Sequence, residues 1–450
     1  MAVTAKQPEK SDQRPPRSRL ALWARKFGTA LGRPIVSVIL AFIAGAIVII
    51  ITWPDKTVDP FTNVLHAYST LFTGSFGTGT NFSNTLVTVT PLIFTSLSVA
   101  IAFRAGLFNI GAAGQLAVGA MAADMIGLTY SSWPSWLLVP AMLLASILAG
   151  ALWGGIVGFL KAWRGAHEVV TTIMLNWIAF WGTDYLITSA PFTAPFGVQQ
   201  TIALSPQAQL PSIAALYNQT LGNFLPQLDP FTLFSYTVDV SIFLALIAVL
   251  IYWFIISRTT FGYEIRVIGE NPKAAQYAGI PTKRHIFLVM AIAGAFAGLA
   301  GSTHLMGQPG YELSATAFSQ DPTGFDAIAV ALLGRTTAIG VLLASLFFGG
   351  LRSGSTAMQA IAHVDPNLVL IIEALVLFFI AAEFLPVIQR IMPNWMGLGR
   401  RPSLVPATIG GIASVEVPEM SNGNGDGENE LNITDLDQAE PGQAEPGKEE

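Results

Sequence analysis

The sequence has no cysteine among its 450 residues. This absence excludes disulfide bonds, thiolate nucleophiles and metal sites built on cysteine. Charge is scarce as well, because only 11% of the residues are Asp, Glu, Lys or Arg, whereas 52% are hydrophobic. An ordinary soluble domain carries about 25% charged residues, so this composition indicates a membrane protein.

Motifs for catalysis and phosphate binding are also missing. There is no G-x-x-x-x-G-K-[ST] phosphate loop and no H-E-x-x-H zinc motif. We therefore expect no enzyme activity, no metal, no cofactor and no nucleic-acid partner; if ATP powers this protein, the ATPase must be a separate chain. The five histidines are scattered without metal-ligand spacing: His66, His167, His285, His304 and His363.

The basic residues indicate on which side of the membrane the chain begins. Residues 1–33 hold eight Lys or Arg against Glu9 and Asp12, and such segments stay cytoplasmic. The apolar run 34–53 is long enough to span a bilayer, and no small-residue cleavage site follows it, so we expect it to be retained. The transmembrane permease domain then extends over 34–390.

The apolar runs predict an all-α polytopic membrane protein with about ten transmembrane helices. The long segment 191–240 lacks Lys and Arg, so we expect it to be an external loop. Five spans on each side of it form two inverted five-helix halves, an architecture that transporters often have. The expected spans are 34–53, 85–103, 107–128, 136–160, 169–190, 241–256, 285–306, 325–333, 336–350 and 368–388.

Two topologies are open for 325–350, where Arg335 interrupts the apolar run. If Arg335 marks a cytoplasmic turn between a half-helix and a return helix, both termini are cytoplasmic. If 325–350 is one span, the C-terminus lies outside, against the positive-inside rule, so we prefer the first topology. The glycine-punctuated segments 107–128 and 325–350 fall at corresponding third positions of the two halves.

The C-terminal segment 402–450 differs in composition from the rest of the chain. It is rich in Gly, Asn and Glu and repeats the sequence QAEPG at 438–442 and 443–447. Because it cannot bury a hydrophobic core, we expect an acidic, disordered tail.

A basic loop at 258–284 contains a short helix with both ends marked. Asn271 is a good N-cap, Pro272 suits the first helical position, and Gly279 suits a left-handed exit. So short a helix needs a packing partner, and Ala274, Ala275 and Ala278 offer a smooth face for one. We interpret the loop as a cytoplasmic docking element; the alternative is a connecting loop with one helical turn. The candidate residues are Gly269, Glu270, Asn271, Pro272, Ala274, Ala275, Ala278 and Gly279.

Polar side chains inside the expected spans are candidates for a solute pathway, because burying them in hydrocarbon is costly. Asn109, Gln115 and Asn176 could hydrogen-bond a neutral polar solute, and their neighbours Phe108 and Trp177 could stack on a planar one. The alternative is that the three amides only connect helices.

The acidic residues in the apolar spans allow other interpretations. Asp184 and Asp326 lie near expected external ends, where we expect solvated caps. Glu373 and Glu383, ten residues apart in the last span, could belong to a proton relay, although a local pair of Glu373 with Arg352 is the preferred interpretation.

Three motifs carry a family resemblance: FRAGLFNIGAAGQLAVGA (103–120), EVVTTIMLNWIA (168–179) and IGENPKAAQYAGI (268–280). Together they resemble the membrane permeases of bacterial ABC importers, in the branch that contains ribose and branched-chain amino-acid permeases, and most of all the nucleoside-uptake permeases. The likeness covers about 85–390. The family position that matches Ala113 is often acidic, which puts a charge-based role for Ala113 in doubt.

The resemblance implies a permease subunit in the bacterial plasma (inner) membrane that moves a nucleoside or related sugar-containing solute by alternating access. It implies an ABC ATPase subunit, a second homologous permease, an extracytoplasmic substrate-binding lipoprotein, the small-molecule substrate and membrane lipid as partners. The coupling helix that reads the ATPase would be 269–279.

Two other functions compete with this one. An ion-coupled secondary transporter would work without an ATPase and use Glu373 and Glu383 as proton carriers. A membrane scaffold would recruit partners through the acidic tail.

Overall fold

A computed structural model describes residues 19–52, 59–189, 191–195, 198–224 and 226–381. Regular structure within these residues is helical throughout, with three isolated β-bridges and no strand. This confirms the all-α fold. Residues 1–18, the acidic tail 402–450 and Glu383 lie outside the described residues.

The first half of the described chain holds six helices where five were predicted. The additional helix is α2, and α1 begins well before the expected start at Pro34, which lies inside it. The helices are α1 (Arg19–Thr52), α2 (Pro60–Phe76), α3 (Gly79–Arg104), α4 (Ala112–Thr129), α5 (Ser135–Arg164) and α6 (Glu168–Ile187).

The segment between the halves contains short helices rather than loop alone. They are η2 (Pro206–Ala208), α7 (Ile213–Thr220), η3 (Leu221–Asn223) and α8 (Pro230–Ser235). The second half contains α9 (Ser241–Arg258), α10 (Thr260–Glu270), α11 (Pro272–Tyr277), α12 (Thr282–Gly307), α13 (Ala317–Gln320), α14 (Thr323–Leu333), α15 (Ala338–Ala362) and α16 (Asn367–Ala381).

Seven of these helices are long and apolar enough to cross a bilayer: α1 from Pro34 onward, α3, α4, α5, α9, α12 and α15. Each of the other three predicted spans also corresponds to a helix, namely α6, α14 and α16. The chain is therefore a multi-pass membrane protein, while ten crossings and the side on which each terminus lies stay predictions.

The segment 325–350 is not one helix. α14 ends at Leu333 and α15 begins at Ala338, and between them Arg335 and Thr336 both have a φ of 51°. Two consecutive residues in the left-handed region cannot continue a right-handed helix. The half-helix and return helix of the preferred topology are therefore present, and the return helix runs to Ala362, well past the expected end at 350.

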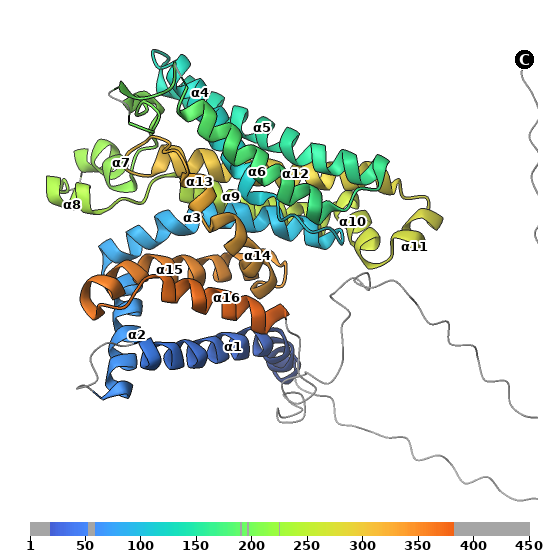
Figure 1. Cartoon of the computed structure of the whole chain (residues 1–450), viewed down its shortest axis with the longest axis horizontal. Helices are drawn as coiled ribbons and strands as arrows, with labels where there is room; N and C mark the ends of the chain where they lie inside the picture. The colour runs from blue at the N-terminus through green and yellow to red at the C-terminus, as the bar shows by residue number, and fades with distance from the viewer. Residues whose placement is uncertain (1–18, 53–58, 190, 196–197, 225, 382–450) are drawn as a thin grey trace, which may run out of the picture. The chain divides into compact units, whose positions relative to one another are not determined.

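Among the described helices, the most extensive packing joins α5 to α12, which lie side by side in Figure 1. Gly150 and Gly154 of α5 face Gly294 and Gly298 of α12 so tightly that a Cβ on Gly150 would lie 2.2 Å from the Gly294 carbonyl oxygen. Small residues let helix backbones approach in this way in membranes. The glycine rows of the two helices are thus packing surfaces.

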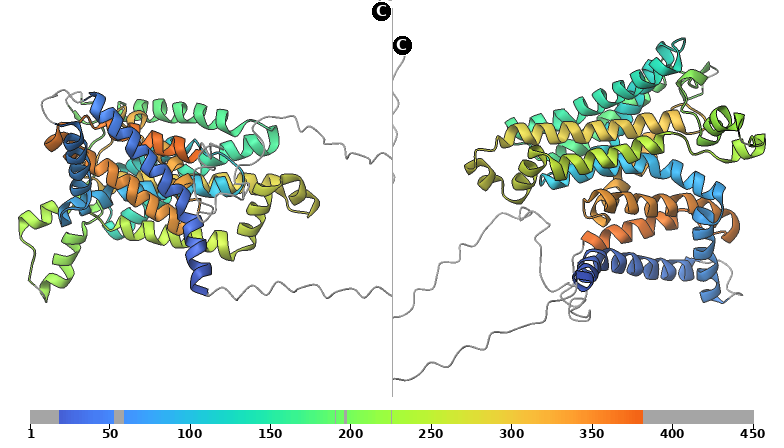
Figure 2. Two further views of the ribbon diagram at one scale, coloured as in Figure 1. Left: turned by 90° about the horizontal axis from the view of Figure 1, so that it is seen from below. Right: turned by 180° about the vertical axis from the view of Figure 1, so that it is seen from behind.

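The two ends of the described bundle carry different elements. In Figure 1, α10 and α11 lie at one end, and α7 and α8 lie at the opposite end. The helices α1, α15 and α16 run between these ends, whereas α2 lies across them (Figure 2). α2 is fixed to α15 by a hydrogen bond from the Ser75 hydroxyl to the Gly350 carbonyl.

Candidate functional site

The short helix α11 is built as its sequence predicts. The Asn271 side-chain oxygen accepts hydrogen bonds from the backbone N–H groups of Lys273 and Ala274, at 3.1 and 3.0 Å. Pro272 occupies the first turn, and Gly279 has a φ of 79°. Both predicted caps are confirmed, so the helix ends are fixed by local chemistry.

The alanines of α11 do not share one face. Ala275 is fully buried against the protein, whereas Ala274 and Ala278 are exposed. The exposed surface also presents Tyr277, whose side chain is 93% accessible. The sequence interpretation missed this tyrosine, although an aromatic residue in a short capped helix is a recognisable anchor for a protein partner.

A rigid base supports α11. Gly269 at the end of α10 packs on the end of α3, where a Cβ would lie 2.4 Å from the Arg104 carbonyl oxygen. His285 of α12 contacts the Glu264 carboxylate of α10 at 2.5 Å and the Pro281 carbonyl at 3.0 Å. The loop 258–284 is therefore tied to two long helices, α3 and α12.

The break between α14 and α15 lies near this same end of the bundle. The Thr336 carbonyl accepts hydrogen bonds from the Arg104 guanidinium at 3.1 and 3.2 Å and from the Tyr252 hydroxyl at 2.7 Å. Arg104 also borders Gly269. The turn that Arg335 was expected to mark therefore lies on the α11 side of the protein.

The three amides proposed for the solute pathway bond to the protein itself. Asn109 and Gln115 exchange two hydrogen bonds, at 2.9 and 3.0 Å, and Asn109 also donates to the Ser98 hydroxyl. Asn176 accepts from the Gly114 N–H and donates to the Ile110 carbonyl. All three residues are buried. This geometry favours the alternative in which the amides hold the irregular segment before α4 in place.

The two aromatic candidates lie in different surroundings. Phe108 is half-buried and meets Phe103 edge to face, with ring centroids 5.1 Å apart. Trp177 is 52% exposed on α6. The structure does not bring these rings together with the amides into one pocket, and a solute contact at any of the five residues stays a prediction.

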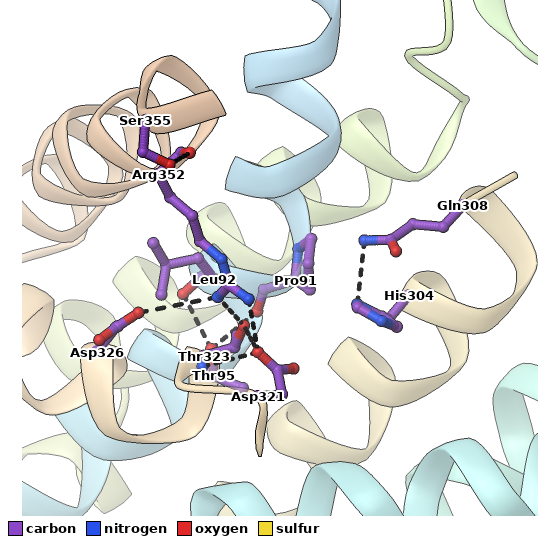
Figure 3. A network of polar contacts seen from close by, with 10 residues as sticks. All are labelled: Pro91, Leu92, Thr95, His304, Gln308, Asp321, Thr323, Asp326, Arg352 and Ser355. Carbon is purple, nitrogen blue, oxygen red and sulfur yellow. Dashed lines mark hydrogen bonds and ion pairs between the residues drawn. The ribbon is translucent and has the colours of Figure 1, made fainter. Parts of the chain in front are cut away.

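A second polar site was missed, and it lies inside the bundle (Figure 3). The Arg352 guanidinium of α15 donates to the Thr323 hydroxyl at 2.8 Å and to the Asp321 carboxylate at 3.0 Å. Asp321 also accepts from the N–H and the hydroxyl of Thr323, so the three groups close a ring at the start of α14. Asp326, one turn further along α14, lies 3.9 Å from the same guanidinium.

Asp326 is therefore not the solvated cap that its sequence position suggested, since its side chain is only 14% exposed and lies beside Arg352. His304, of α12, and Gln308 lie on the other side of Asp321 (Figure 3), joined by a contact of 3.2 Å. The preferred pair of Glu373 and Arg352 is not a direct contact: Glu373 is 4% exposed, and neither of its oxygens has a hydrogen-bond partner. The signal for this cluster was three charges in apolar surroundings, at 321, 326 and 352.

Comparison with known proteins places most of the membrane domain in one family. The family model described as "Branched-chain amino acid transport system / permease component" matches residues 81–381. The chain belongs to this permease family. It is a transport permease and not an enzyme, which confirms the resemblance carried by the three motifs.

This chain aligns with three relatives in this family over nearly the whole length of each relative. The guanosine ABC transporter permease protein NupP of Bacillus subtilis is 38% identical over 78% of this chain and 93% of its own. The nucleoside ABC transporter permease protein NupB of Lactococcus lactis is 33% identical over 80% of this chain and 93% of its own. The glucose ABC transporter permease protein TsgB13 of Haloferax volcanii is 33% identical over 82% of this chain and 90% of its own. No solved structure matches the chain.

Proposed function

We propose that this chain is the membrane-spanning permease subunit of an ATP-binding-cassette importer that translocates a nucleoside or a related sugar-containing solute. It lies in a bacterial plasma membrane with both termini in the cytoplasm. It works with an ATPase subunit, a second homologous permease and an extracytoplasmic substrate-binding lipoprotein, and moves solute by alternating access.

The observation that carries this proposal is the coupling element formed by α10 and α11. Ala274, Tyr277 and Ala278 form a small exposed surface on a helix whose inner face is buried. An aromatic side chain among small residues is typical of a protein interface. Because the element is tied to α3 and α12, a push from a bound ATPase would be transmitted directly into the membrane helices.

The nature of the solute is supported by the relatives. Guanosine, nucleosides and glucose are named for the three permeases that match most of their own length. These solutes share a polyhydroxylated sugar ring, while only some carry a base. The proposal therefore names a sugar-containing solute, with a nucleoside first because the 38% identical relative is a guanosine permease.

Affinity purification of the chain from native membranes tests the coupling element. The wild type should retain an ATPase and a second permease, and the double substitution Ala274→Glu with Ala278→Glu should lose the ATPase while keeping the second permease. Both alanines are exposed, so the substitutions leave the helix packing intact. Thr220→Glu, which adds one negative charge where the double variant adds two, changes an exposed site on α7 at the opposite end and is the control. Recovery of equal amounts of ATPase with the double variant would refute the docking role.

A further inference from the structure

The cluster of Arg352, Asp321, Asp326 and Thr323 lies where transmembrane helices meet. Arg352 comes from the middle of α15, and the other three lie at the start of α14. Figure 3 shows them beside the turn of α3 that contains Pro91 and Thr95. Ionisable groups are expensive in this position and are kept where they serve a ligand or a pathway.

The cluster has more hydrogen-bond acceptors than donors. Arg352 is its only guanidinium, and its recorded bonds go to Thr323 and Asp321. A carboxylate offers about four lone-pair sites. Asp326 has only the 3.9 Å approach to Arg352, and the oxygens of Glu373 have no hydrogen-bond partner. A ligand that brings hydroxyl donors would supply what these carboxylates lack.

The guanidinium side of the cluster is the most accessible part, because the Asp321 and Asp326 side chains are only 13% and 14% exposed. The Arg352 side chain is 35% exposed, although it lies in a membrane helix. His304 and Gln308 border the same region (Figure 3). The Gln308 amide nitrogen lies 3.2 Å from Nδ1 of His304.

A metal ion is a poorer candidate than a polyol. Among the described residues, no three His, Asp or Glu side chains converge closely enough to coordinate a metal. Arg352 would also repel a cation, since its guanidinium lies between Asp321 and Asp326. A neutral ligand avoids this repulsion and can use both the guanidinium and the carboxylates.

We propose that the Arg352 cluster is the binding site for the sugar hydroxyls of the transported solute. Asp326 accepts hydrogen bonds from two neighbouring hydroxyls, and Arg352, held by Asp321 and Thr323, donates to a hydroxyl or ring oxygen. The sugar is the part that guanosine and glucose share, so this assignment rests on the proposed function and narrows it to recognition of the sugar.

The competing interpretation is that the cluster only fixes the start of α14. That region packs tightly on α4, since a Cβ on Gly324 would lie 2.4 Å from the Cβ of Ala113. If the cluster were purely structural, substitutions in it would affect assembly and maximal rate but would leave the preference of the transporter for solutes with sugar hydroxyls unchanged.

The test measures uptake by proteoliposomes that contain the complete transporter with its ATPase and binding protein. The probes are radiolabelled guanosine and its 2′,3′-dideoxy analogue. For the wild-type transporter, the KM for the analogue should be roughly 10- to 100-fold higher than the KM for guanosine. This is the loss of affinity expected when hydrogen bonds to charged groups are removed. Asp326→Asn should raise the KM for guanosine by a similar factor and remove most of the preference for guanosine over the analogue.

Asp229→Asn is the matched control, because Asp229 caps α8 and lies outside the membrane helices. The KM of this variant for guanosine should equal that of the wild type. Equal KM values for guanosine and the analogue in the wild type would overturn the assignment, and this comparison holds even if Asp326→Asn does not fold. An unchanged guanosine KM in Asp326→Asn would also overturn it. Absence of ATP-dependent uptake of both guanosine and glucose by the wild type would instead reject the proposed function on which the assignment rests.

Discussion

Asn176 is a single side chain that holds two backbone groups of the irregular segment before α4. Its oxygen accepts from the buried Gly114 N–H, and its nitrogen donates to the part-buried Ile110 carbonyl. In a membrane interior, neither backbone group could turn to water instead. One amide thus replaces the helical hydrogen bonds that the break at 105–111 leaves unmade.

Replacing Asn176 with Ala should therefore destabilise the protein. Leaving buried donors and acceptors unpaired costs about 1–3 kcal/mol each, so we expect a clear fall in the unfolding temperature, measured in mild detergent. Gln227→Ala removes an amide from an exposed site and is the control. Equal unfolding temperatures for the two variants would contradict the role given to Asn176.

Asp229 gives the short helix α8 a pH dependence. Hydrogen bonds from the Thr232 N–H and hydroxyl hold the pKa of the Asp229 carboxyl below its ordinary value. The ionised cap thus stabilises α8 fully at pH values above the ordinary pKa of Asp, about 3.9. This contribution to stability is lost as the pH falls through the lowered pKa of Asp229.

Exchange of the backbone amide hydrogens of residues 230–235, corrected for the intrinsic rate at each pH, should therefore be faster below the lowered pKa of Asp229 than at neutral pH. Asp229→Asn should show a smaller change with pH, because its side chain does not titrate. Identical pH profiles for the two proteins would show that ionisation of Asp229 does not hold α8.

At the scale of elements, the glycine contact between α5 and α12 sets how the helices of the two halves meet. A Cβ on Gly294 would lie 2.0 Å from the Gly150 carbonyl oxygen, while one on Gly182 of α6 would meet nothing within 4 Å. Ala is a better helix former than Gly by about 1 kcal/mol. Replacing Gly with Ala should therefore change the stability of the protein in opposite directions at the two sites.

Gly294→Ala should destabilise the protein by about 1–3 kcal/mol through overpacking, and Gly182→Ala should be neutral or slightly stabilising. Thermal unfolding in detergent, followed by light scattering and intrinsic fluorescence, compares the two directly. If Gly294→Ala were as stable as the wild type, α5 and α12 would not be packed as closely as the structure shows.

The elements also show how far sequence reasoning reaches. The caps of α11 were predictable because Asn271, Pro272 and Gly279 act within a few residues of one another. α2 was missed because its apolar residues alternate with Thr, Ser and His, and it is too short to be found as a span. The Arg352 cluster was missed because the partners of Arg352 come from other elements, and Thr323 and Asp321 lie 29 and 31 residues away in sequence, so only the fold brings them together.

At the scale of the whole molecule, the permease domain accounts for the proposed activity. The family match covers 81–381 and ends before the acidic tail at 402–450. A transporter lacking 402–450 should therefore take up solute at the wild-type rate, whereas a scaffold that recruits partners through the tail would lose them. Uptake by membranes that contain equal amounts of the two forms measures the difference.

In the proposed function, a separate ATPase drives solute through this chain by way of α11. The test is guanosine uptake by proteoliposomes that contain the complete transporter. Uptake is measured with and without ATP on the side of the membrane that carries the ATPase, and with and without a protonophore. We expect uptake that requires ATP, survives the protonophore and is abolished by Ala274→Glu with Ala278→Glu. Uptake that proceeds without ATP and collapses with the protonophore would contradict the proposed function and point to an ion-coupled carrier.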